Sequence, residues 1–163
     1  MKKIIVGLLF LVISTSSFSQ YKLQEGQTQL NTGVGFSNWG IPVYIGFDYG
    51  VHRNISLGVE FSYRNNYNSN HVNYKQQTIA INPNGNFHFT GLLGIPEEFD
   101  IYLGLTPGFW FRSNGVTGIK SNGFSIGGQV GGRWYFTDNL GVNFELGGGS
   151  MFDGGKIGIT YIF

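Results

Sequence analysis

One serine of the chain has the spacing that some hydrolases use for a nucleophile. Gly123-Phe124-Ser125-Ile126-Gly127 matches G-x-S-x-G, a pattern in which a tight strand-to-helix turn exposes the serine hydroxyl. Here the serine lies at the start of an alternating apolar stretch, and no helical pattern follows it. Because the chain contains 27 glycines, a chance match is expected. We therefore predict no nucleophile at Ser125.

Metal binding or acid–base chemistry would need histidines placed near other ligands. His52, His71 and His88 do not have the spacing of zinc ligands, and the chain has no cysteine. His52 and His71 lie in polar segments and are expected to contact water, whereas His88 points to the polar side of an alternating segment. We predict no metal site, no cofactor and no enzymatic activity.

Eight charged residues have a more informative spacing, because each lies in or next to an apolar stretch that alternates with period two. Successive side chains of a β-strand point to opposite faces, so these residues share the polar faces of their strands. Ions away from bulk water are tolerated only where they are paired and hydrogen-bonded. We therefore predict one polar network of four acids and four bases: Asp48, Glu60, Asp100, Glu145, Arg64, Arg112, Arg133 and Lys156.

One contact within this network follows from the short link Thr137-Asp138-Asn139. Folding the chain about this link places Arg133 opposite Asn143. Glu145 then lies one diagonal step from Arg133, within reach of a long side chain.

Eight segments position these residues, and each carries apolar residues at every second position. The fourth segment is the weakest, because Pro83-Asn84-Gly85 interrupts it, and we expect a bulge or kink there. The predicted strands are Leu30–Ser37, Ile41–Val51, Ile55–Arg64, Gln76–Thr90, Phe99–Phe111, Phe124–Phe136, Leu140–Gly149 and Lys156–Phe163.

The apolar faces of these eight segments carry no charged residue, which indicates that they face lipid. An ionised side chain facing lipid at mid-depth costs ~2–4 kcal/mol. In lipid an all-β chain must close on itself, since an open sheet edge would leave backbone groups unpaired. The predicted fold class is therefore all-β, as an eight-stranded antiparallel up-and-down transmembrane β-barrel.

The connections alternate between short and long, as they do in membrane barrels. The links at 52–54 and 137–139 are short, whereas residues 65–75 and 113–123 are predicted to form longer polar loops. Amphipathic rings are expected near both ends of the strands, where they settle at the water interfaces. These rings are Tyr49, Phe99, Trp134, Phe136, Tyr161 and Phe163 at the turn end, and Phe36, Phe61, Tyr63, Phe109, Phe111 and Phe124 at the loop end.

The start of the chain has the pattern of a secretory signal peptide. Lys2 and Lys3 precede the apolar run 4–13, and small residues at Ser17 and Ser19 fit cleavage after Ser19. The predicted organisation is a signal peptide at 1–19, an N-terminal periplasmic segment at 20–29 and the barrel at 30–163. The formal charge of +1 becomes −1 without Lys2 and Lys3, so bulk charge offers nothing to a nucleic acid.

The C-terminus carries a pattern known from one protein family. Ile157-x-Ile159-x-Tyr161-x-Phe163 resembles the terminal strand of outer-membrane barrels, and the region from Gln29 to Phe163 is similar to small OmpX/OmpA-type barrels, particularly those of Bacteroidetes. The resemblance implies a location in the outer membrane of a Gram-negative bacterium, in contact with lipid and lipopolysaccharide. It also implies that Ile157, Ile159, Tyr161 and Phe163 form the signal that the barrel-assembly machinery reads.

The sequence is compatible with three functions. We favour a monomeric, non-enzymatic barrel with a side-chain-filled lumen and a structural or surface-interaction role through loops 65–75 and 113–123, whose ligand the sequence does not identify. An eight-stranded barrel is just wide enough for its own side chains, but many inward positions are glycine and leave space for a narrow channel or small-solute carrier. A lipid-modifying enzyme is the third candidate, and no serine shares a lipid-facing surface with a histidine.

Overall fold

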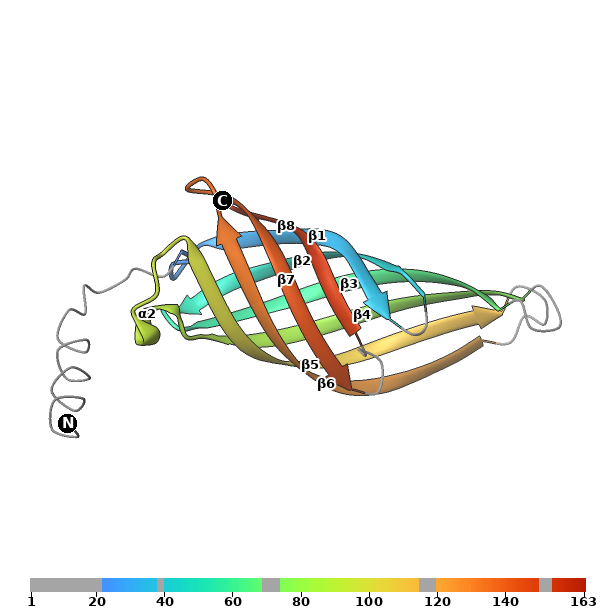
Figure 1. Ribbon diagram of the computed structural model, residues 1–163. Helices are drawn as coiled ribbons and strands as arrows, with labels where there is room; N and C mark the ends of the chain where they lie inside the picture. The colour runs from blue at the N-terminus through green and yellow to red at the C-terminus, as the bar shows by residue number, and fades with distance from the viewer. Residues whose placement is uncertain (1–21, 38–39, 69–73, 115–119, 150–153) are drawn as a thin grey trace, which may run out of the picture.

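The computed structural model describes residues 22–37, 40–68, 74–114, 120–149 and 154–163. These residues form one closed barrel in which each strand is hydrogen-bonded to its neighbours in the chain (Figure 1). The strands are β1 (Thr28–Ser37), β2 (Pro42–His52), β3 (Ile55–Asn68), β4 (Tyr74–His88), β5 (Phe99–Asn114), β6 (Lys120–Tyr135), β7 (Leu140–Gly149) and β8 (Gly154–Ile162).

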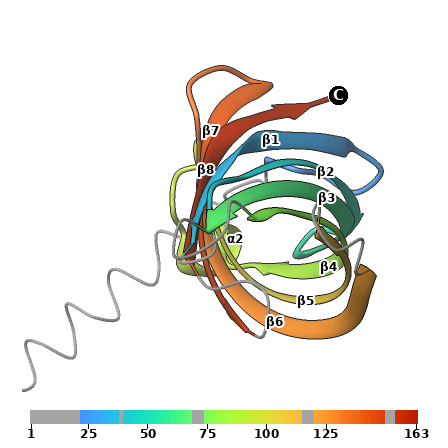
Figure 2. The same ribbon diagram turned by 90° about the vertical axis from the view of Figure 1, so that its right-hand side faces the viewer.

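The barrel closes between its first and last strands. β1 pairs antiparallel with β2 on one side and with β8 on the other, from Gln29 opposite Ile162 to Ser37 opposite Gly154. Seen along its length, the sheet forms a continuous ring (Figure 2). The predicted eight-stranded, antiparallel, up-and-down topology is confirmed.

The two faces of the strands differ as the period-two pattern predicts. In β2 and in most of β6, buried and exposed residues alternate along the strand. The exposed face carries the large apolar side chains, and the inward face carries the buried polar ones. All twelve aromatic residues predicted at the strand ends lie on the exposed face, and several contact one another there, as Phe109 and Phe124 do at 5.2 Å between ring centroids.

Two central hairpins are longer than predicted. β3 and β4 pair as far as Asn68 opposite Tyr74, and β5 and β6 pair as far as Ser113 opposite Lys120. Most of the predicted loops 65–75 and 113–123 is therefore strand, and only residues 69–73 and 115–119 lie outside the described part of the chain. Polar side chains on both faces suggest loops, but a hairpin that projects into water needs no apolar face to pair its backbone. These hairpins extend past the shorter strands at one end of the barrel, here called the loop end (Figure 1).

The predicted bulge at Pro83-Asn84-Gly85 is wrong. β4 stays in register with β3 through this stretch, with Pro83 opposite Val59. On its other side, pairing with β5 stops after Ile81–Phe109 and resumes in the same register at Gly85–Leu105, which places Pro83 opposite Pro107. Neither proline has an N–H to donate, so the ladder has a gap without a change of register.

The opposite end, here called the turn end, is covered by the segment before β1 and by a short helix. Residues 22–27 fold back on β2, where Gly26 N donates to Gly50 O at 2.9 Å. Leu23 is buried there with Tyr135 and Ile162. The link between β4 and β5 contains α2 (Thr90–Leu93), which ends at Gly94 with a left-handed φ of 62°. Among the described residues no helix is long and apolar enough to cross a membrane.

The predicted division of the chain differs from the structure at one boundary. β1 begins at Thr28, so the last two residues of the segment 20–29 belong to the barrel wall. The predicted signal peptide, residues 1–19, lies outside the described residues.

Candidate functional site: the polar network of the lumen

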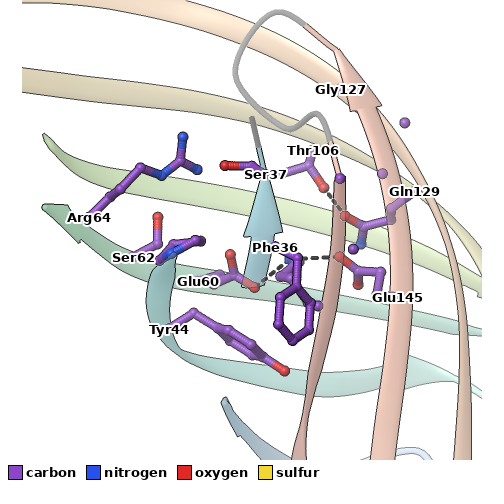
Figure 3. Close-up of a pocket in the computed structure, with 16 residues that line it drawn as sticks. Phe36, Ser37, Tyr44, Glu60, Ser62, Arg64, Thr106, Gly127, Gln129 and Glu145 are labelled. Atoms are coloured by element: carbon purple, nitrogen blue, oxygen red, sulfur yellow. Dashed lines mark hydrogen bonds and ion pairs between the residues drawn. The ribbon is translucent and has the colours of Figure 1, made fainter. Parts of the chain in front are cut away.

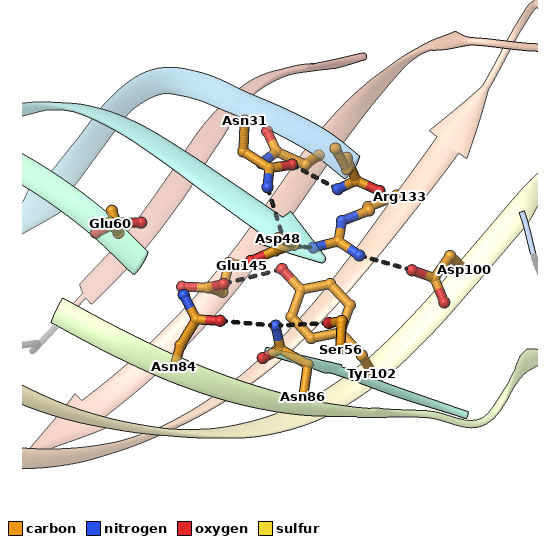
Figure 4. Close-up of polar contacts among 12 residues, drawn as sticks. Asn31, Asp48, Ser56, Glu60, Asn84, Asn86, Asp100, Tyr102, Arg133 and Glu145 are labelled. Carbon is orange, nitrogen blue, oxygen red and sulfur yellow. Dashed lines mark hydrogen bonds and ion pairs between the residues drawn. The ribbon is translucent and has the colours of Figure 1, made fainter. Parts of the chain in front are cut away.

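Arg133 is the centre of the first cluster in the lumen. Its Nη2 atom lies 2.6 Å from Asp48 Oδ2 and its Nη1 atom lies 2.9 Å from Asp100 Oδ2 (Figure 4). The guanidinium also lies over the ring of Tyr102, 4.3 Å from the ring centroid. The Arg133 side chain is only 2% exposed, so the ion pairs are shielded from solvent.

The strand register explains one of these pairs and barrel closure explains the other. Asp100 on β5 lies directly opposite Arg133 on β6. Asp48 comes from β2, across the lumen, and is held there by Asn31 Nδ2, which donates to Asp48 Oδ2 at 3.0 Å. Arg133 does lie opposite Asn143, as predicted, but its carboxylate partners are Asp48 and Asp100 and not Glu145.

A serine and a histidine extend the first cluster. His88 Nδ1 lies 2.9 Å from Asp100 Oδ1, and His88 Nε2 lies 3.0 Å from Ser56 Oγ. This order of acid, histidine and serine is the order found in hydrolase triads. Ser56 is 0% exposed, however, so no substrate reaches its hydroxyl in this structure.

Sequence reasoning places His88 on the inward side but does not identify Ser56 and Asp100 as its partners. The period-two alternation of β3 could have identified Ser56, because it puts Ser56 on the same inward face as Glu60. His52 is exposed, as expected, and His71 lies outside the described residues. In the described part of the chain no group of three or more His, Asp or Glu side chains could hold a metal ion.

Lys156 is the centre of a second cluster, nearer the loop end. Its Nζ atom lies 2.7 Å from Glu60 Oε2 and 2.6 Å from Glu145 Oε1. Glu145 lies directly opposite Lys156 in the β7–β8 register, whereas Glu60 reaches the lysine from β3. The Tyr102 hydroxyl donates to Glu145 Oε2 at 2.8 Å and so joins the second cluster to the first.

Uncharged side chains fill the space between the ions. Gln129 Nε2 donates to Asn86 Oδ1 at 2.7 Å, and the Thr106 hydroxyl donates to Gln129 Oε1. The Tyr44 hydroxyl donates to Asn143 Oδ1 at 3.1 Å across the barrel. Polar side chains from every part of the wall therefore meet in the lumen.

Two small cavities lie next to the Lys156 cluster in the described part of the lumen. The cavity toward the loop end has a volume of about 40 Å³ and is lined by Arg64, Ser62 and Phe36, among others (Figure 3). The deeper cavity has a volume of about 20 Å³ and reaches Arg133 and Asp48. Volumes of this size hold one or a few water molecules. Tyr44, Glu60, Thr106, Gln129, Glu145 and Lys156 line both cavities and separate them.

Most of the inward glycines for which the structure gives contacts do not leave free space, contrary to expectation. A Cβ atom built on Gly131 would lie 2.2 Å from Tyr102 Cζ, and one on Gly58 would lie 2.1 Å from Asp48 Oδ1. These positions are already occupied by the polar side chains of neighbouring strands. The glycines make room for the network.

Arg64 and Arg112, the remaining predicted members, lie closer to the loop end than either cluster. Arg64 on β3 pairs with Thr78 on β4, which in turn pairs with Arg112 on β5. Arg112 Nε donates to Thr78 Oγ1 at 3.4 Å, and its guanidinium lies over Trp110. The single network predicted from the sequence is therefore divided, with the four acids and two of the bases in the lumen interior.

The four residues of the predicted assembly signal lie on the face of β8 that the period-two alternation predicts. Ile157, Ile159, Tyr161 and Phe163 are all exposed on the outer face of the barrel. Ile162, between the last two, points inward and is buried. Their position on the outer face is confirmed, and their recognition by the assembly machinery stays a prediction.

Comparison with known proteins adds structural relatives but no sequence family. No protein-family model matches the chain, and no curated protein matches it. Among solved structures, the outer membrane protein OprG from Pseudomonas aeruginosa is similar with a TM-score of 0.67 and 9% sequence identity, over 88% of this chain and 99% of that chain.

Two other solved structures have the same architecture. The N-terminal β-barrel domain of Pseudomonas aeruginosa OprF has a TM-score of 0.61 and 13% identity, over 85% of this chain and 98% of that chain. Neisserial surface protein A has a TM-score of 0.56 and 14% identity, over 83% of this chain and 93% of that chain. At these identities the likeness concerns the fold alone. The chain has the fold of the small eight-stranded outer-membrane β-barrels, as its sequence predicts.

Proposed function

We propose that this protein is a non-enzymatic outer-membrane barrel whose lumen is closed by its own side chains, and that it acts as a structural or surface-interaction protein. The observation that carries the proposal is the pair of ion clusters that cross the lumen. Arg133 joins β2, β5 and β6, and Lys156 joins β3, β7 and β8. Steady flow of a solute would have to break both sets of ion pairs.

The energetics of buried ions favour a closed lumen. Separating a buried pair leaves an uncompensated charge, which costs about 3–5 kcal/mol. The barrel is also near the lower limit of diameter, at which side chains suffice to fill the interior. The cavities of about 40 and 20 Å³ are too small for a solute larger than a few water molecules.

The location and partners follow from the outer surface. A continuous exposed apolar face suits contact with acyl chains, and the structural relatives are outer-membrane proteins. We infer an outer-membrane location reached through the signal peptide 1–19, with lipid and lipopolysaccharide around the barrel and the assembly machinery as a transient partner. The protein is inferred to be a monomer that binds no nucleic acid.

The surface for interaction is the projecting part of the two long hairpins. With its predicted loop bounds corrected, the described part of this surface consists of the loop-end halves of β3–β4 and β5–β6. It stands beyond β1, β2, β7 and β8 (Figure 1). Deletion of either hairpin tip, followed by cell- and glycan-binding assays, tests this role, and unchanged binding contradicts it.

A narrow channel is the second candidate, because the two cavities share the residues of the Lys156 layer in their linings. Planar-bilayer recording of the refolded mature protein distinguishes the two. A closed lumen predicts a baseline without steady open steps in symmetric potassium chloride. Steady open currents from the wild-type protein would remove the closed-lumen proposal in favour of the channel.

A further inference from the structure

The link between β4 and β5 differs in chemistry from the other described links at the turn end. The links at 52–54 and 137–139 consist of polar residues. The β4–β5 link instead carries Leu92 and Leu93, which are 64% and 62% exposed. Single exposed apolar residues are ordinary on a protein surface, whereas neighbouring ones mark sites of contact. These two residues are here called the leucine pair.

The leucine pair is held in place by hydrogen bonds on both sides of α2. The Thr90 hydroxyl donates to Asp100 Oδ1 at 3.2 Å and accepts from Ile101 N at 3.1 Å. Ile95 N donates to Thr90 O at 3.2 Å, so the backbone turns back directly after the helix. Gly94, with its left-handed φ of 62°, allows this return. The exposure of the leucine pair is therefore a fixed feature of the fold.

The link borders the lipid-facing wall of the barrel. Ile95 lines an apolar hollow of the outer face together with Phe99, Ile101 and Trp134, and these three residues are exposed there. Gly132 and apolar residues of β7 and β8 line most of the rest. Three inward residues also border the hollow, and they are buried and hydrogen-bonded in the lumen: Asp100, Arg133 and Asn143. The apolar outer surface therefore continues from the wall onto the link.

Aromatic rings flank the link on both of its strands. Phe87 and Phe89, at the end of β4, have ring centroids 4.9 Å apart. Phe99, at the start of β5, stacks on Trp134 with ring centroids 6.5 Å apart. Rings of this kind settle where a membrane meets water. The link, which lies at the turn end with α2, is therefore placed at this boundary (Figure 1).

Two acidic residues limit how deeply the link enters a membrane. Glu97 and Glu98 are both exposed and follow shortly after the leucine pair. An ionised side chain is costly in the hydrocarbon and far less costly near the interface. The link therefore suits the boundary itself, with its leucines toward the acyl chains and its carboxylates toward water.

We propose that the β4–β5 link is an interfacial anchor, whose leucine pair inserts between the lipids of the leaflet at the turn end. The inference rests on the proposed outer-membrane location, in which this leaflet is the periplasmic one. Lipid is the occupant because the leaflet that surrounds Phe99 and Trp134 also reaches Ile95 and the residues just before it. A segment with an apolar side and a polar side lies in the plane of the boundary, where its buried apolar area holds it.

Spin labelling of the full mature protein in vesicles of phosphatidylethanolamine and phosphatidylglycerol tests the proposal. The chain has no cysteine, so Leu92→Cys and Leu93→Cys each carry a nitroxide at one known position. Relaxation enhancement by oxygen, which concentrates in lipid, is compared with enhancement by a water-soluble nickel chelate. Both labels are expected to have a higher oxygen-to-nickel ratio than a label on Arg53→Cys, the matched control, which is exposed in a polar link at the same end. Because both leucines are exposed, neither substitution removes buried packing.

A label on Val130→Cys distinguishes failure of the anchor from failure of the membrane assignment, because Val130 lies on the outer face between Leu103 and Leu146. Ratios at the leucine pair no higher than at Arg53, with a lipid-like ratio at Val130, overturn the anchor alone. A water-like ratio at Val130 overturns the membrane assignment and the anchor with it. Spin–spin broadening at the leucine pair that persists on dilution with lipid places a second copy of the chain there, which also overturns the proposal.

Discussion

Tyr102 passes over Gly131 to reach Glu145. The three residues lie side by side on β5, β6 and β7, with Tyr102 opposite Gly131 and Gly131 opposite Glu145. The Tyr102 hydroxyl donates to Glu145 Oε2 at 2.8 Å. A residue without a side chain on the middle strand is what allows the ring to lie flat enough to join the two ion clusters.

Replacing Gly131 with alanine is expected to destabilise the barrel. The added methyl group would lie 2.2 Å from Cζ of a Tyr102 ring that is itself buried, so the ring or the backbone must move. Overpacking of this kind costs about 1–3 kcal/mol in unfolding free energy. Urea titration in detergent or lipid vesicles measures the change. Gly148→Ala is the control, because a Cβ atom there meets nothing within 4 Å, and equal effects of the two substitutions would show that the lumen is loosely packed.

Arg133→Gln is expected to be more damaging than any loss of a surface charge. The substitution leaves Asp48 and Asp100 buried without their cation, at a cost of ~3–5 kcal/mol. The same urea titration measures it, with Arg53→Gln as a control that changes an exposed arginine. Adding Asp100→Asn to Arg133→Gln should restore part of the loss, since one unpaired carboxylate is then removed. A loss no greater than that of Arg53→Gln contradicts the description of Arg133 as the centre of a buried cluster.

The sequence predicts which face each residue takes but not which residues meet across the lumen. Period two assigns Asp48 and Arg133 to inward faces without any knowledge of the partners. Their contact joins residues 85 positions apart and depends on how the strands are staggered when the barrel closes. No local pattern carries that information.

The same limit explains why the reach of Glu145 does not decide which acid pairs with Arg133. Glu145 lies diagonally from Arg133, but Lys156 lies directly opposite Glu145, and Asp100 lies directly opposite Arg133. Both direct partners lie across other hairpins, whose register the short link at 137–139 does not determine. The extra length of the β3–β4 and β5–β6 hairpins was not predicted for a different reason. Their projecting ends are rich in polar residues, which also occur in loops.

Arginine substitutions along the outer face of β6 can test which part of the barrel lies in the bilayer. Val130 and Asn122 both point outward, but Val130 lies between Leu103 and Leu146, whereas Asn122 lies opposite Phe111 near the loop end. Val130→Arg is expected to cost ~2–4 kcal/mol in unfolding free energy in lipid vesicles, and Asn122→Arg about 0–1 kcal/mol. Equal costs at the two positions would mean that the outer face does not cross a bilayer, which would remove the basis of the membrane assignment.

Phe163→Ala is expected to impair assembly in cells while it leaves the stability of the folded barrel in vitro almost unchanged. The Phe163 ring is exposed on the outer face and contacts mainly the neighbouring Tyr161, with ring centroids 5.1 Å apart, so its removal takes little from the folded barrel. If the terminal residues are the signal for the assembly machinery, the variant refolds normally from urea into detergent but accumulates unassembled in cells. Heat-modifiable gel mobility of membrane fractions measures the assembled share. Phe124→Ala removes an equally exposed ring at the opposite end of the barrel and should assemble normally, whereas normal assembly of Phe163→Ala would refute a role of this residue in recognition.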